Sequence, residues 1–154
     1  SVASRGLGDV YKRQPYIYRV RQVHKVVDGD TIDVDIDLGF DVSLAKRVRL
    51  AGVDTPESRT KDEYEKKLGL EAKEWLKHHL EGATDIIIKT QLPDSTEKYG
   101  RILGWLYINN ETSSLNERMI QEGYAWSYLG DTKVKDFKLL EERRKGNVDQ
   151  RNFV

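Results

Sequence analysis

The strongest constraint on the fold is a run of alternating apolar and acidic residues early in the chain. Four apolar residues alternate with three aspartates over residues 32–38: Ile32, Asp33, Val34, Asp35, Ile36, Asp37 and Leu38. Such alternation is typical of a half-buried β-strand with one face on the core and the other in solvent. Asp28-Gly29, just before the run, is a dipeptide typical of a tight turn between strands. The chain is therefore expected to begin with a β-hairpin whose aspartates form a solvated outer face.

The order of the remaining elements predicts a small barrel. Strands are expected at residues 16–27, 32–38, 42–53, 84–92 and 101–108. Helices are expected from about residue 68 to Gly82, at residues 115–123 and at residues 134–146. Five short strands interrupted by a helix after the third fit an α+β fold, a five-stranded Greek-key β-barrel of the OB-fold type with three helices.

The start of the first helix is less sharply marked than its end. Thr60 and Glu63 have the spacing of a capping box, which indicates an early start. Gly69 weakens a helix by about 1 kcal/mol relative to alanine. We therefore expect a loop over residues 58–67 and a helix that begins near Leu68.

Composition excludes several classes of function. The 154 residues correspond to one domain, and the chain has no cysteine, which excludes disulfides, thiolate metal sites and a cysteine nucleophile. No apolar run of about 18 residues is present, so no membrane association is expected. Three histidines without an HExxH pattern give no sign of a zinc site, and there is no GxSxG motif of a serine hydrolase. A formal net charge of zero gives no overall sign of a basic nucleic-acid-binding surface.

The first fourteen residues, "SVASRGLGDVYKRQ", show no clear periodicity. We expect residues 1–14 to be a non-native or disordered tail and residues 15–154 to form the folded domain. Without the tail the chain carries 23 basic and 25 acidic residues.

Charged residues gather at the ends of the expected strands. Asp30 follows the first turn, and Asp54 and Glu57 follow the third strand, where Pro56 stiffens the turn between them. Taken alone, Asp30 is an ordinary turn residue. Carboxylate oxygens also suit calcium or magnesium, and carboxylates combined with arginines such as Arg49 are the components of a metal-assisted phosphodiesterase.

Three motifs in order, "VVDGDTIDV", "RLAGVDTPES" and "EKYGRILGWLYI", resemble the thermonuclease (staphylococcal nuclease) family. The resemblance covers roughly residues 17–145 and implies a calcium site. Asp30 and Asp54 would bind Ca²⁺ through their side chains, and Thr55 through its carbonyl oxygen. Glu57 would position or activate the attacking water; its role as general base is a hypothesis.

The same resemblance implies a phosphate site and a nucleotide site. Arg49 and Arg101 would bind the scissile phosphate and stabilise its transition state. Lys98 and Tyr99 would line the nucleotide site, and Tyr128 would pack against a base. The implied substrate is nucleic acid, either single-stranded DNA or RNA, which is cleaved at the P–O5′ bond to leave 3′-phosphorylated products.

Two alternatives to a nuclease stay open on the sequence alone. One is a nuclease-like OB-fold module that binds nucleic acid with weak or no catalysis, and the other is an unrelated oligonucleotide-binding barrel. The presence of all five key residues favours the enzyme: Asp30, Arg49, Asp54, Glu57 and Arg101. Near-neutral charge predicts weaker binding of nucleic acid than in strongly basic family members. We expect a monomer, and the implied calcium requirement favours an extracellular enzyme.

Overall fold

The computed structural model describes residues 15–91, 101–128, 130 and 133–152. The expected N-terminal tail, Lys98 and Tyr99 lie outside the described residues. No helix in the described part of the chain is both long and apolar enough to cross a membrane.

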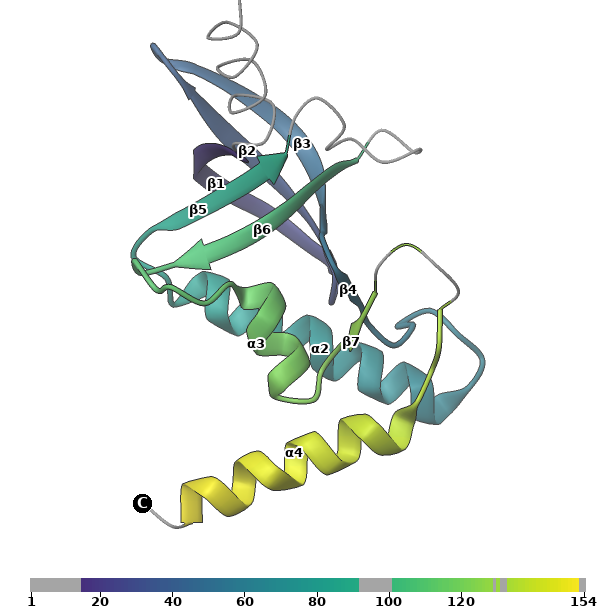
Figure 1. The fold of residues 1–154 in the computed structure, drawn as a ribbon. Helices are drawn as coiled ribbons and strands as arrows, with labels where there is room; N and C mark the ends of the chain where they lie inside the picture. Colours follow the sequence, from purple (N-terminus) through teal and green to yellow (C-terminus); the bar gives the residue numbers. More distant parts are fainter. Residues whose placement is uncertain (1–14, 92–100, 129, 131–132, 153–154) are drawn as a thin grey trace, which may run out of the picture.

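Five strands close into a barrel, as the sequence predicts (Figure 1). Their order around the barrel is β1-β2-β3-β6-β5, with the bounds β1 (Pro15–Asp28), β2 (Thr31–Gly39), β3 (Val42–Leu50), β5 (Ile86–Gln91) and β6 (Ile102–Ile108). Neighbouring strands pair antiparallel except β3 and β6, which pair in parallel over three residues of each strand. The α+β fold with a five-stranded barrel is therefore confirmed.

The third expected strand, residues 42–53, is divided in the structure. Strand β3 ends at Leu50, and Gly52 has a φ of +74°, a conformation that ends regular strand geometry. The chain then re-enters β structure as β4 (Val53–Asp54), which pairs antiparallel with β7 (Trp126–Ser127) in a separate two-stranded ribbon. In the view of Figure 1 this ribbon lies between the barrel and α4.

The first helix begins earlier than expected. Helix α2 spans Glu63–Glu81, and its N-cap is Asp62, whose carboxylate accepts hydrogen bonds from the backbone N–H groups of Tyr64 and Glu65. The expected loop over residues 58–67 and the Thr60 capping box were therefore wrong in part. An aspartate at the N-cap satisfies two of the unpaired N–H groups of the first turn, which offsets the cost of Gly69 within the helix.

The other two helices differ from expectation mainly at their ends. Helix α3 (Leu115–Gln121) has the predicted Ser114 cap, with the hydroxyl accepting from the Glu117 N–H at 3.1 Å. Helix α4 (Phe137–Asn152) begins after Asp136 and runs past Gly146, where we expected it to stop. Gly146 lowers the stability of the helix only through its low helix propensity, and the helix continues on both sides of it.

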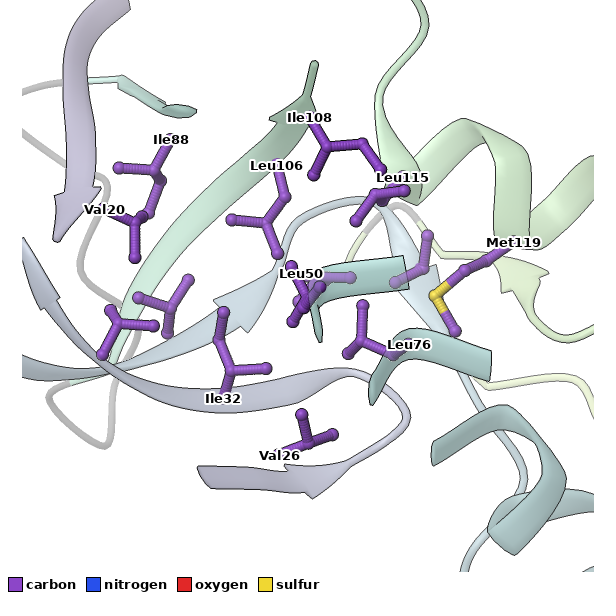
Figure 2. Close-up of a cluster of buried hydrophobic side chains, with 14 of the residues drawn as sticks. Val20, Val26, Ile32, Leu50, Leu76, Ile88, Leu106, Ile108, Leu115 and Met119 are labelled. Atoms are coloured by element: carbon purple, nitrogen blue, oxygen red, sulfur yellow. The ribbon is translucent and has the colours of Figure 1, made fainter. Parts of the chain in front are cut away.

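The core joins the inner face of the barrel to the helices. Ile32, Val34 and Ile36 of β2 are at most 2% exposed and belong to the same buried cluster as Leu76 of α2 and Met119 of α3. Figure 2 shows Ile32, Leu76 and Met119 within this cluster. The alternation of β2 thus predicted its buried face correctly, up to Leu38, which is exposed beyond the barrel.

The acidic face of β2 lies outside the barrel and is partnered by bases on the neighbouring strands. Asp33 pairs with Arg47, Asp35 with His24, and Asp37 with Arg21. The Arg47 hydrogen bond lowers the pKa of Asp33. These aspartates therefore have basic partners on the surface of the barrel and lie apart from the acids of the candidate site.

Asn116 of α3 connects the barrel to the ribbon. Its side-chain amide is 2% exposed, donates to the carbonyls of Ala51 (2.8 Å) and Gly104 (3.1 Å), and accepts from the Leu106 N–H (3.1 Å). A buried amide with all these partners fixes the end of β3 relative to β6. The short link from β3 to Asp54 therefore starts from a rigid point.

Candidate active site

A small polar cavity of about 140 Å³ opens where the β1–β2 turn meets the segment after β4. Five of the nine residues that the sequence predicts for the site line it: Asp30, Arg49, Thr55, Glu57 and Arg101. Two larger hollows, of about 380 and 310 Å³, lie along α2 and between β1 and α2, and neither contains a predicted site residue. The polar cavity is therefore the candidate active site.

Asp30 is held at the cavity by the turn between β1 and β2. Its backbone carbonyl accepts from the Leu50 N–H at 2.8 Å, and its carboxylate accepts from the hydroxyls of Thr31 (2.9 Å) and Thr55 (3.1 Å). Gly29 allows the turn to approach α2, because a Cβ there would lie 2.8 Å from the Cβ of Ala72. The carboxylate position is thus set by packing as well as by hydrogen bonds.

Asp54 is the most buried acid of the site. It belongs to β4, pairs in register with Trp126 of β7, and is 4% exposed. Burial raises the pKa of Asp54, and the nearby Asp30 raises it further, whereas Lys133 and Arg49 act in the opposite direction. The carboxylate therefore lacks enough nearby positive charge to offset its burial, and an additional cation would stabilise its ionised form.

Arg49 lies between the two aspartates. Its Nη2 atom is 3.4 Å from Asp30 Oδ2 and 3.7 Å from Asp54 Oδ1, and its Nη1 donates to the Leu50 carbonyl at 2.9 Å. Only 8% of the residue is exposed. An arginine inside an apolar strand requires polar partners. Arg49 has three of them, the two aspartates and a backbone carbonyl.

Glu57 projects from the segment after β4 and is exposed. Its backbone N–H donates to Glu65 Oε1 at 3.3 Å, and that buried carboxylate also accepts from Lys135 Nζ at 2.7 Å. The same segment packs on Gly69, where a Cβ would lie 2.7 Å from the Glu57 carbonyl. Helix α2 therefore fixes the backbone of Glu57 and leaves its side chain open to solvent.

Lys133 also lines the cavity, although no sequence motif predicts it there. Its Nζ is 3.4 Å from Asp54 Oδ1 and 5.7 Å from the centre of the Tyr128 ring. The ring of Tyr128 is thereby placed beside the site. A polar loop lysine shows no pattern of its own, so only the pairing of β4 with β7 could have indicated its position.

The donor chemistry of the cavity is that of a hard divalent cation, although the described side chains supply only part of a coordination shell. Among the described residues, no group of three or more His, Cys, Asp or Glu side chains is placed to hold a metal ion. Asp30 and Asp54 supply two carboxylates around Arg49. Calcium takes six to eight oxygens. Backbone, water and substrate oxygens would have to complete the shell.

Comparison with known proteins gives the family. The family model described as "Staphylococcal nuclease homologue" matches residues 47–153. The thermonuclease of Staphylococcus intermedius is 33% identical over 124 residues, which cover 80% of this chain and 68% of that protein. The micrococcal nuclease of Shigella flexneri is 29% identical over 130 residues, covering 78% of this chain and 64% of that protein.

An uncharacterized protein of Methanocaldococcus jannaschii is 33% identical over 140 residues, covering 79% of this chain. The chain spans 65% of the length of that archaeal relative. The family match over more than half of the chain agrees with the barrel, the ribbon and the clustered acids and arginines. The chain belongs to the staphylococcal nuclease family.

Proposed function

We propose that the chain is a calcium-dependent nuclease that hydrolyses single-stranded DNA and RNA at the P–O5′ bond and leaves 3′-phosphorylated products. The observation that carries the proposal is the meeting of Asp30, Arg49, Thr55, Glu57 and Arg101 around one cavity. These residues come from separate parts of the chain, and membership of a nuclease family supports the same chemistry.

The two aspartates and the Thr55 carbonyl would hold calcium, which supplies positive charge next to the phosphoryl oxygens when bound. Asp30 and Asp54 also hold the guanidinium of Arg49 at the cavity wall. Arg49 and Arg101 bind the phosphate, and their charge offsets the negative charge that develops on its oxygens during attack.

Glu57 acts on the attacking water. Its side chain is exposed at the cavity while its backbone is fixed by α2, so the carboxylate can orient a water molecule and accept its proton. Water at the open cavity protonates the leaving 5′ oxygen, and Glu57 returns its proton to solvent, which completes the hydrolysis.

The proposed nucleotide site lies next to the cavity. Tyr128 lies beside the cavity through Lys133 and offers a ring on which a base can stack. Lys98 and Tyr99 are proposed to contact the nucleotide as well, but both lie outside the described residues.

The first experiment is cleavage of a fluorophore–quencher single-stranded DNA oligonucleotide with calcium, with magnesium and with chelator, and of the matching RNA. Cleavage in calcium that chelator abolishes, with 3′-phosphate ends identified by mass spectrometry, is the expected result. Absence of cleavage by folded protein under all conditions would refute the nuclease proposal. Retained oligonucleotide binding in that case would favour a nuclease-like binding module.

A further inference from the structure

Lys133 places an ammonium group against the most buried acid of the candidate site. Its Nζ lies 3.4 Å from Asp54 Oδ1, while the Asp54 side chain is only 5% exposed. The lysine comes from the segment between β7 and α4, and β7 pairs with β4, the strand that carries Asp54. The proposed site thus already contains a cation that belongs to the chain.

This ammonium group and a calcium ion would compete for the same carboxylate. Calcium binds carboxylate oxygens at about 2.3–2.6 Å, closer than the Lys133 Nζ lies now. Both aspartates already have basic partners, since Arg49 lies within 3.7 Å of both and Lys133 contacts Asp54. A divalent ion bound to these carboxylates meets repulsion from both bases unless one of them moves away.

Lys133 is the base that can move. Its side chain is 46% exposed, whereas that of Arg49 is 9% exposed. Arg49 is additionally held by its hydrogen bond to the Leu50 carbonyl. A long, half-exposed lysine can turn into solvent at little cost, and a buried arginine cannot.

We infer that Lys133 is a tethered cation that neutralises Asp54 in the metal-free protein and competes with calcium for it. Calcium binding then requires displacement of the ammonium group, so the lysine sets the affinity of the site. The inference rests on the proposed assignment of Asp30 and Asp54 as calcium ligands. It extends that assignment to a residue that controls how readily the ligands become available.

The direct test is calcium affinity, measured by isothermal titration calorimetry on the full chain without nucleic acid. Lys133→Met is expected to bind calcium about 10-fold more tightly than the wild type, a typical size for a coupling between sites. Lys133→Gln removes the same charge with a polar side chain and should behave alike. Lys133→Arg keeps the charge and should stay close to the wild type.

Lys135→Met is the matched control. Lys135 lies on the same segment with a similarly exposed side chain, 40% against 46%, but it pairs with Glu65 instead of Asp54. Its replacement should leave calcium affinity within about threefold of the wild type. Equal or weaker calcium binding in both Lys133→Met and Lys133→Gln would overturn the inference.

Thermal stability gives a second, independent readout. In chelator, Lys133→Met should melt a few degrees below the wild type, because a buried carboxylate loses its ammonium partner. In saturating calcium the two proteins should melt together, so the calcium-induced increase in Tm is larger in the variant. An unchanged calcium-induced increase would also count against the inference.

The outcomes separate this inference from the proposed function. Tighter calcium binding in Lys133→Met without any cleavage of DNA or RNA would support the tethered cation and refute the nuclease. If the wild type cleaves nucleic acid but neither the wild type nor Lys133→Met binds calcium, the tethered cation is refuted. That result would support a nuclease that uses another metal or none.

Discussion

Gly69 of α2 lies directly against the backbone of Glu57. A Cβ built on Gly69 would come within 2.7 Å of the Glu57 carbonyl carbon and oxygen and of the Pro56 carbonyl oxygen. Backbone atoms cannot yield as a flexible side chain can, so helix and segment touch only because residue 69 has no side chain. The position of the proposed catalytic carboxylate therefore depends on a missing methyl group in a neighbouring helix.

Gly69→Ala should lower both stability and activity. The methyl group pushes the segment of Glu57 away from α2, at a cost of about 1–3 kcal/mol that outweighs the gain of about 1 kcal/mol in helix propensity. Urea denaturation and kcat measure the two effects. Gly146→Ala in α4 is the control, since a Cβ there has no neighbour within 4 Å and should stabilise the protein slightly. Equal stabilisation by both substitutions would show that the contact at Gly69 is unimportant.

Glu57→Gln should lower kcat by about 10²–10⁴-fold, the range for loss of a general base, with little change in the free energy of unfolding. The side chain is exposed, and its backbone contact to Glu65 does not involve the carboxylate. Single-turnover cleavage of the oligonucleotide measures the loss, and chemical denaturation checks the fold. Wild-type turnover in this variant would exclude a role for Glu57 in activating water.

Asp54→Asn should stabilise the metal-free protein at neutral pH. Burial raises the pKa of Asp54 above its ordinary 3.8, so the folded state retains this proton at pH values where the unfolded chain has lost it. The stability contributed by this group therefore falls as the pH rises through that interval. Denaturation in chelator should show the gain at pH 7 and its disappearance below pH 3.8.

In saturating calcium the wild type should be more stable than Asp54→Asn, the reverse of their order in chelator. The wild type gains the binding energy of the ion, whereas Asp54→Asn loses one of two carboxylate ligands and gains less. An Asn variant less stable than the wild type at pH 7 in chelator would contradict the raised pKa.

Lys135 and Glu65 should act as one unit on catalysis. The Lys135 hydrogen bond holds Glu65, which accepts the Glu57 N–H, and the same bond raises the pKa of Lys135. Lys135→Met and Glu65→Gln should each lower kcat severalfold without changing KM, and the double variant should be no worse than the worse single one. Partial rescue by Lys135→Arg is expected. Additive losses would mean that the two residues act separately.

The fold was predictable where a local pattern carries it. The alternation from Ile32 to Leu38 predicted the strand and its buried face, and Ser114 predicted the start of α3. The start of α2 was missed because Gly69 was interpreted through helix propensity alone. Position 69 requires glycine because it contacts the backbone of Glu57. This contact joins two segments of the chain and cannot be predicted from the sequence of either one.

The candidate site was predictable from its ordered motifs, and the structure brings Asp30, Arg49, Thr55, Glu57 and Arg101 to one cavity. Their chemical roles stay predictions. The residues outside those motifs could not be found in the same way. Lys133 reaches Asp54 because β4 and β7 pair over two residues each, and strands that short have no periodicity to detect.

The pairing of β4 with β7 also has a consequence for the newly made chain. Asp30 directly precedes β2, whose first residue Thr31 pairs with Arg49, so Asp30 and Arg49 can meet early, but Asp54 gains its β partner only from Trp126. The parallel pairing of Arg49 with Leu103 is likewise distant in sequence, and loop-closure entropy makes such contacts slow to form. A chain whose Trp126 has not yet emerged from the ribosome therefore lacks an assembled site. Under the proposed function, such a chain would leave intact the messenger RNA from which it is being translated.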